Sequence, residues 1–260
     1  MNLINHIIDI DNLIKLTQDA GKAILEVYNS EDFEVQIKSD NSPLTIADKR
    51  SNKIITDGLT EYYPEIPIIS EEGKSIDYSV RKNWDKFWLV DPLDGTKEFI
   101  NKNGEFTVNI ALIENNIPIC GVIYIPCTKE IFYGSALTGS FKINPHGIKE
   151  EIFVSVKDFS NPINVVQSRT HSGDEENEFY SKYKINERVS KGSSLKICLV
   201  AEGKAELYFR GGPTWEWDTA AGHAILISAG GYFLNKDKSK LVYNKKDLKN
   251  YGFIASSKKI

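Results

Sequence analysis

Residues 87–96 are Phe87-Trp88-Leu89-Val90-Asp91-Pro92-Leu93-Asp94-Gly95-Thr96, a short apolar run that ends in an acidic turn. Four apolar residues are too few for an independent helix and are typical of a buried strand. Pro92 presets the backbone of a turn and Gly95 tolerates a positive φ, so Asp91 and Asp94 converge. Two carboxylates about 4 Å apart repel by roughly 4 kcal/mol at an effective dielectric of 20. The strand end therefore predicts a hard cation, the alternative being an ordinary Asp-rich turn.

Two other segments place acids beside apolar residues. The run 66–69 precedes Ser70-Glu71-Glu72-Gly73, and Trp215-Glu216-Trp217-Asp218 puts Asp218 at the start of a predicted helix. Taken alone, Glu72 is typical of a solvated loop and Asp218 of a helix N-cap. Together with the Leu93 carbonyl, the acids form an all-oxygen set of Glu71, Asp91, Asp94 and Asp218. Such a set favours Mg²⁺ or Mn²⁺ over zinc.

The composition is that of a globular protein, with 260 residues, 41% of them hydrophobic and 26% charged. A net charge of −4 offers no basic field for nucleic acid or anionic lipid. Cys120, Cys127 and Cys198 form no C-x-x-C pair, which predicts neither a disulfide framework nor a zinc site and favours a reducing cytoplasm. No stretch approaches the ~20 apolar residues that a membrane span requires.

The remaining pattern predicts an α/β protein, of the α+β kind, with domains at 1–150 and 151–260 and the active site between them. Helical spacing over 3–28 and 45–59 flanks an alternating strand at 33–37, and an antiparallel meander is expected over 107–133. Beyond residue 150, strands and helices alternate over 163–166, 174–183, 194–202, 205–209 and 217–229. Five lysines near the end of the chain are expected to form a solvated surface: Lys236, Lys238, Lys240, Lys245 and Lys246.

In order and spacing, residues 70–72, 91–96 and 217–222 resemble the three signatures of the inositol monophosphatase superfamily, the Li⁺-sensitive, Mg²⁺-dependent phosphatases. Residues 38–48, 97–99, 192–196 and 212–218 resemble its 3'(2'),5'-bisphosphate nucleotidase branch. The resemblance spans nearly the whole chain and implies a layered α/β/α/β/α sugar-phosphatase fold. It also implies that two or three Mg²⁺ ions, with Mn²⁺ as a substitute, are shared among Glu71, Asp91, the Leu93 carbonyl, Asp94 and Asp218.

The same resemblance assigns water activation to Asp48, assisted by the Thr96 hydroxyl with Thr45 nearby. Asp48 follows Thr45 by three residues, and residues so spaced share a helix face, although Asp48 can also be interpreted as a surface acid. The implied substrate contacts are Glu71, Leu93, Asp94, Gly95, Thr96, His171, Ser194, Lys196, Arg210 and Asp218. Unpaired N–H groups at Gly95 and Thr96 suit the scissile phosphate.

Ser194, Lys196 and Arg210 are expected to bind a second phosphate. The alternative makes Lys196 and Arg210 solvated charges and Ser193 a helix N-cap. His223 shows no ligand spacing and is expected to be a packed histidine.

The implied reaction is hydrolysis of the 3'-phosphate of adenosine 3',5'-bisphosphate to AMP and phosphate by metal-activated water, with inhibition by Li⁺. One alternative is an inositol monophosphatase or sugar-phosphate phosphatase of the same superfamily. Another is a non-catalytic Mg²⁺ or nucleotide-binding regulator. The expected partner is a small nucleotide bisphosphate and not a nucleic acid. We expect a monomer or homodimer without a transmembrane segment, in the cytoplasm or resting on the cytoplasmic face of the inner membrane.

Overall fold

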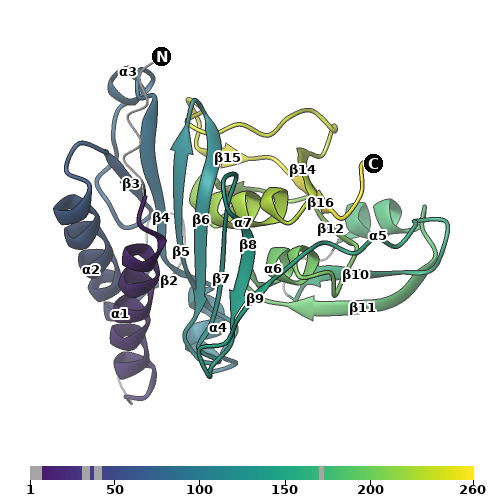
Figure 1. The fold of residues 1–260 in the computed structure, drawn as a ribbon, viewed down its shortest axis with the longest axis horizontal. Coiled ribbons are helices and arrows are strands. Elements are labelled where there is room, and N and C mark those ends of the chain that lie inside the picture. The colour runs from purple at the N-terminus through teal and green to yellow at the C-terminus, as the bar shows by residue number, and fades with distance from the viewer. Residues whose placement is uncertain (1–7, 31–35, 38–42, 170–172) are drawn as a thin grey trace.

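A computed structural model describes residues 8–30, 36–37, 43–169 and 173–260, and it arranges their helices and strands in layers (Figure 1). The helices are α1 (Ile10–Tyr28), α2 (Ile46–Tyr62), α3 (Tyr78–Arg81), α4 (Thr96–Ile100), α5 (Asp174–Tyr180), α6 (Leu195–Ala201) and α7 (Glu216–Ser228). Among the described residues, no helix combines the length and the apolar composition that a membrane span needs.

A seven-stranded sheet forms the centre of the first half. Its strands, in spatial order, are β3 (Ile68–Ser70), β4 (Lys86–Asp94), β5 (Thr107–Glu114), β6 (Ile117–Ile125), β7 (Glu130–Ser135), β8 (Gly139–Ile143) and β9 (Lys149–Glu151). β3 runs parallel to β4 and the other pairs are antiparallel, which confirms the predicted meander. The strand predicted at 87–90 is longer than expected, because β4 continues through the acidic turn with a register shift between Asp91 and Asp94.

A five-stranded sheet forms the second half. Its spatial order is β11 (Ile185–Lys191), β10 (Ile163–Ser168), β12 (Leu207–Arg210), β16 (Phe253–Ser256) and β14 (Tyr232–Asn235). Two short ribbons pair β1 (Gln36–Ile37) with β2 (Pro43–Leu44) and β13 (Thr214–Trp215) with β15 (Lys249–Asn250). β11 was not predicted, because this edge strand is mostly polar and none of its residues is buried. The predicted solvated surface is confirmed for Lys236, Lys238, Lys240 and Lys246, which are exposed, whereas Lys245 is half-buried.

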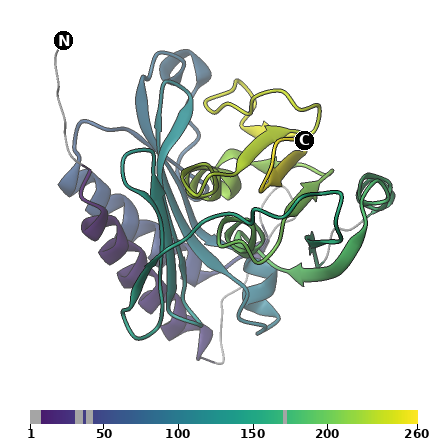
Figure 2. The same ribbon diagram turned by 45° about the vertical axis from the view of Figure 1, so that its right-hand side comes forward.

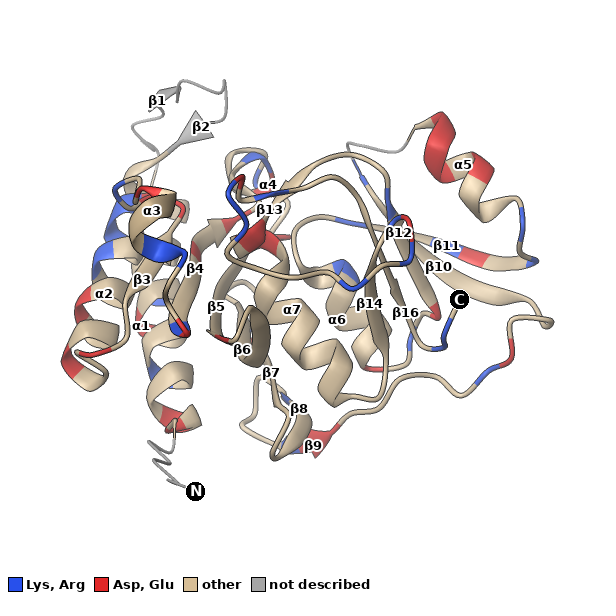
Figure 3. Cartoon of the chain, turned by 90° about the horizontal axis from the view of Figure 1, so that it is seen from above, with Lys and Arg blue, Asp and Glu red and all other residues tan. Residues whose placement is uncertain are grey.

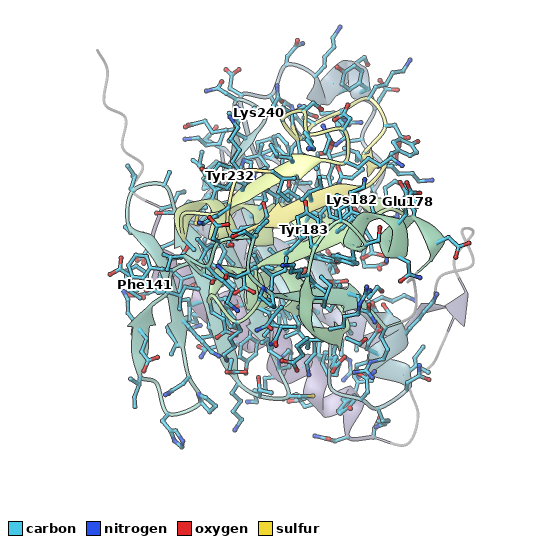
Figure 4. All side chains as sticks on the ribbon, turned by 90° about the vertical axis from the view of Figure 1, so that its right-hand side faces the viewer. Phe141, Glu178, Lys182, Tyr183, Tyr232 and Lys240 are labelled. Atoms are coloured by element: carbon cyan, nitrogen blue, oxygen red, sulfur yellow. The ribbon has the colours of Figure 1, made fainter. Side chains whose placement is uncertain are left out.

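The layers are stacked in the order α/β/α/β/α, as predicted. α1 and α2 cover one face of the seven-stranded sheet, and α6 and α7 lie between the two sheets (Figures 1 and 2). α5 packs on the outer face of the five-stranded sheet, over Leu207 and Phe209. The helix predicted over 174–183 ends early, at Tyr180, and the Tyr183 ring beyond it lies 5.8 Å from the Phe159 ring (Figure 4).

The inner core joins both halves of the chain. Ile123 of the first sheet, Ile225 of α7 and Tyr208 of the second sheet belong to one buried cluster. At Gly121 a Cβ atom would lie 2.4 Å from the Ala221 carbonyl oxygen, so α7 reaches the sheet only because this residue is glycine. The domain boundary at residue 150 stays a prediction, and the core around α7 crosses it.

Candidate active site

A cleft of about 280 Å³ opens where the turn after β4 meets the starts of α6 and α7. Acidic residues gather near this point, around β4, α4 and α7 (Figure 3). The lining includes nearly all residues predicted for the site: Glu71, Asp91, Leu93, Asp94, Gly95, Thr96, Ser194, Lys196, Arg210 and Asp218. Asp48 reaches the cleft through Thr96, and His171 lies outside the described residues.

The acids Glu71, Asp91, Asp94 and Asp218 form what we call the acidic cluster. Asp91 is only 1% exposed, and its Oδ1 accepts the Leu93 N–H at 3.1 Å, which closes the turn. Burial raises the pKa of Asp91 well above its usual range, and the charges of the other cluster members raise it further. Burial and the neighbouring carboxylates also raise the pKa of Asp218. Like charges therefore meet in a buried position, and their mutual repulsion favours a bound cation.

Asp218 owes its place to the start of α7. The N-cap of α7 is Trp215, and Asp218 sits three residues further on, so the interpretation of Asp218 as an N-cap is wrong. Its Oδ2 accepts the Trp215 N–H at 2.9 Å, as in a capping box. The bond turns the carboxylate back toward the helix start, where it lines the cleft.

The donor set fits magnesium. Among the described residues, no three histidine, cysteine or acidic side chains are already arranged around one metal position. Mg²⁺ does not need such a cage, because it keeps several waters and takes one or two carboxylates together with substrate phosphate oxygens. The cluster and the Leu93 carbonyl supply oxygen alone, and the raised pKa values of Asp91 and Asp218 indicate charge that a cation would balance.

Asp48 is fixed by its neighbours on both sides. It is 1% exposed, so the alternative of a surface acid is wrong. Its Oδ2 accepts the Thr45 N–H at 2.8 Å and the Thr45 hydroxyl at 2.6 Å, because Thr45 is the N-cap of α2. Its Oδ1 accepts the Thr96 hydroxyl at 3.3 Å. Thr96 opens α4 behind Gly95, whose φ of 93° lies in the left-handed region that glycine adopts freely.

The residues predicted to bind a second phosphate also line the cleft. Lys196 is 6% exposed, which excludes a solvated charge, and its Nζ donates to the carbonyls of Lys191 at 3.1 Å and Ser193 at 2.7 Å. Burial lowers the pKa of Lys196 to about 8, against the opposing effect of Asp94. Arg210 Nη2 contacts the Pro213 carbonyl at 3.4 Å.

The alternative that made Ser193 the N-cap of a helix is wrong. Ser194, and not Ser193, is the N-cap of α6, and its side chain makes no capping bond. Both hydroxyls instead donate to Asp94 Oδ2, from Ser193 at 2.6 Å and from Ser194 at 2.9 Å.

Sequence reasoning missed Glu105. Its carboxylate accepts hydrogen bonds from Arg169, Lys191 and the Gly192 N–H. No motif marks it, since its partners lie more than sixty residues away. His223, by contrast, is a packed core residue as expected: it stacks on Phe233, and burial lowers its pKa to about 3.

The chain belongs to the inositol monophosphatase family, whose sequence model matches residues 8–260. Enzymes of this family are metal-dependent phosphatases.

The chain is similar over most of its length to proteins named 3'(2'),5'-bisphosphate nucleotidase CysQ. It is 46% identical to that of Salmonella typhimurium over 86% of this chain and 89% of the relative. It is 44% identical to that of Escherichia coli K12, over 95% of this chain and 99% of the relative. The crystal structure of CysQ from Bacteroides thetaiotaomicron superposes with a TM-score of 0.84 at 41% identity, covering 98% of this chain and all 100% of that one.

Proposed function

We propose that this phosphatase is a 3'(2'),5'-bisphosphate nucleotidase, which hydrolyses the 3'-phosphate of adenosine 3',5'-bisphosphate to AMP and inorganic phosphate. The observation that carries the choice of substrate is Lys196. Lys196 is buried and lines the same cleft as the acidic cluster, and in the described chain its ammonium donates to carbonyls and forms no ion pair. A buried cation without a carboxylate partner suits a second substrate phosphate, which an inositol monophosphate lacks.

Glu71, Asp91, the Leu93 carbonyl, Asp94 and Asp218 would hold the metal, as two or three Mg²⁺ ions or Mn²⁺ in their place. When bound, such ions neutralise phosphate charge and lower the pKa of water. Li⁺, as a small monovalent ion, would occupy one position while neutralising less charge, so inhibition by Li⁺ belongs to this proposal.

Asp48 and Thr96 accept and transfer the proton that the attacking water loses. The Thr96 hydroxyl donates to Asp48 Oδ1, and its oxygen keeps a lone pair for a proton of the attacking water. As the water oxygen bonds to phosphorus, its proton passes to Thr96 and the Thr96 proton passes to Asp48. The bond between phosphorus and the 3'-oxygen breaks, and that oxygen takes a proton from solvent. Because Thr45 holds the other oxygen of Asp48, the base keeps its orientation throughout.

The second half of the chain binds the other end of the substrate. Ser194, Lys196 and Arg210 are assigned to the 5'-phosphate side, and His171 to the nucleoside. Gly95 and Thr96 would direct backbone N–H groups at the scissile phosphate.

Competing substrates test the proposal. The purified protein with Mg²⁺ is offered adenosine 3',5'-bisphosphate, inositol 1-phosphate and fructose 1,6-bisphosphate, and kcat/KM is measured for each. We expect the nucleotide to have the highest value. Equal or faster hydrolysis of inositol 1-phosphate would support the inositol phosphatase alternative, and no phosphate release from any of them would support a binding protein.

The variant Lys196→Met tests whether Lys196 gives the protein its preference for the nucleotide bisphosphate. It should lower kcat/KM for the nucleotide about 10- to 100-fold, the usual cost of a lost charge-assisted contact, and leave inositol 1-phosphate nearly unchanged. Oligomeric state and a cytoplasmic location stay predictions from the sequence.

A further inference from the structure

The turn formed by residues 191–194 connects β11 to α6 and lies against Asp94. Ser193 in this turn has a φ of 50°, in the left-handed region that residues with a Cβ atom rarely adopt. Such a conformation persists only where the surroundings hold it in place, and it is common at functional sites. The hydroxyls of Ser193 and Ser194 both reach Asp94 Oδ2. Neither competes with a cation for Oδ1 of the same carboxylate.

Glu105 holds the backbone of this turn. Glu105 is 9% exposed, and its carboxylate accepts the Gly192 N–H at 2.8 Å. The same carboxylate accepts Lys191 Nζ at 3.0 Å and Arg169 Nη2 at 2.9 Å. Burial alone would raise the pKa of Glu105, but these donors outweigh it and the pKa is lowered, so Glu105 stays charged. Charge-assisted bonds of this kind are about twice as strong as neutral ones.

The turn is also packed tightly against the first half of the chain. A Cβ atom at Gly192 would lie 2.6 Å from Glu98 Cγ, so the backbone approaches closely here. Thr107 Oγ1 lies 2.6 Å from Ser193 Oγ, and Asn109 Nδ2 donates to Ser194 Oγ at 3.0 Å. Thr107 and Asn109 stand on β5 and orient the two hydroxyls, whereas Glu105 fixes the main chain that carries them.

We propose that Glu105 is a positioning residue, which holds the 191–194 turn against β5 so that Ser193 and Ser194 keep Asp94 fixed with Oδ1 available to a divalent cation. Glu105 is not among the residues that line the cleft, and it acts through the turn. The proposal rests on the proposed function for the reaction affected, but its effect on metal binding does not depend on the substrate.

The same turn connects the metal side to the second-phosphate side. Lys196 Nζ donates to the carbonyls of Lys191 and Ser193, which belong to the turn. A displaced turn would therefore move the ammonium of Lys196 as well as the hydroxyls on Asp94. Loss of Glu105 should weaken metal binding and also reduce the preference for a bisphosphate over a monophosphate.

Mn²⁺ binding tests the proposal without substrate. Free Mn²⁺ is measured by electron paramagnetic resonance for the full chain, Glu105→Ala, Glu105→Gln and the control Glu130→Gln. Glu130 forms an ion pair with Lys142 at 2.6 Å on β7, away from the cleft. We expect Glu105→Ala to raise the Mn²⁺ Kd about tenfold, the usual effect of losing a group that orients a metal ligand. Glu105→Gln keeps an acceptor for Gly192 and should have a smaller effect, and the control should have none.

A double-mutant cycle with Ser193→Gly shows whether Glu105 acts through the turn. Glycine adopts the φ of this position without strain but lacks the hydroxyl. If Glu105 acts through Ser193, removing both costs less than the sum of the two single effects. Additive effects, or an unchanged Mn²⁺ Kd in folded Glu105→Ala, would overturn the proposal. Should Glu105→Ala fail to fold, Glu105→Gln takes its place in the cycle and an unchanged Kd there counts equally against it.

Activity separates this proposal from the proposed function. If the wild-type protein does not hydrolyse adenosine 3',5'-bisphosphate, the proposed function fails and the Mn²⁺ result still stands. If the wild-type protein is active, Glu105→Ala should lower kcat/KM more for this nucleotide than for adenosine 3'-monophosphate, which has no second phosphate. Equal losses for both substrates would contradict the connection between the turn and Lys196.

Discussion

The Thr96 hydroxyl lies 3.3 Å from Asp48 Oδ1, although 48 residues separate the two in sequence. This contact joins the first turn of α2 to the first turn of α4, and so joins the buried carboxylate to the cleft. The other oxygen of Asp48 is held by the N-cap residue Thr45. A carboxylate fixed on one side and linked through a hydroxyl to the cleft on the other suits the general-base role that we propose for Asp48.

Asp48→Asn should therefore lower kcat about 10²- to 10⁴-fold, the usual contribution of a general base, with a change in KM of only a few-fold. The matched control is Asp57→Asn on the same helix, where the side chain is exposed and pairs with Lys53. Steady-state kinetics and a melting curve for each variant check the expectation. A kcat for Asp48→Asn within threefold of wild type would rule out this role.

Asp91→Asn should stabilise the metal-free protein. Asp91 is buried among like charges, so removing its charge relieves desolvation and repulsion together. The same change should reduce the stabilisation that Mg²⁺ gives, because one ligand is lost. Melting temperatures in EDTA and in Mg²⁺ separate the two effects. A metal-free variant less stable than wild type would contradict the charge balance described for the acidic cluster.

The metal-free protein should lose stability as pH rises. Burial, with the neighbouring carboxylates, raises the pKa of Asp91 and of Asp218 in the folded state. Above about pH 4, where an unfolded aspartate ionises, the native state then binds more protons than the unfolded state. The free energy of unfolding therefore falls from about pH 4 up to the raised pKa values. Urea unfolding in EDTA should show this fall and Mg²⁺ should reduce it, whereas a rise over the same window would contradict the account.

The pH dependence of kcat/KM should show the ionisation of Lys196. Burial lowers its pKa to about 8, so its ammonium loses a proton at alkaline pH in the free enzyme. For adenosine 3',5'-bisphosphate, kcat/KM should fall above about pH 8. Adenosine 3'-monophosphate should show no such limb, and Lys196→Met should abolish it for the bisphosphate. Identical pH profiles of kcat/KM for both nucleotides would contradict a role of Lys196 in substrate preference.

Gly121→Ala should destabilise the protein by about 1 to 3 kcal/mol, because an added Cβ would overpack the contact between β6 and α7. The nearest atom, the Ala221 carbonyl oxygen, would lie 2.4 Å away. Since α7 carries Asp218, Mg²⁺ binding should weaken as well. Gly212→Ala is the control, with its nearest atom at 3.8 Å, and is expected to change stability by less than about 0.5 kcal/mol. Equal stability for both variants would contradict the close packing of α7.

The acidic cluster was predictable because its residues lie at the ends of recognisable elements. Asp91 and Asp94 follow an apolar strand and Asp218 begins a helix, so each position follows from a local pattern. The capping box of Thr45 and Asp48 is also local, with three residues between partners. These features depend on short-range backbone geometry, which sequence patterns capture.

The contacts of the second half depend on tertiary packing and were not predictable. Glu105 and Lys191 are 86 residues apart, and no spacing relates them. The strand β11 is polar because it forms a sheet edge, so it lacks the apolar alternation by which strands are recognised. The positive φ of Ser193 likewise arises from the bonds that hold the turn, and serine has no intrinsic preference for it.

Diffraction from crystals grown with Mn²⁺ and phosphate tests the central claim most directly, because anomalous scattering locates the ions independently of the atomic model. We expect peaks among Glu71, Asp91, Asp94 and Asp218, with phosphate bridging them to Gly95 and Thr96. Ions bound elsewhere, with these four carboxylates left without metal, would contradict the account.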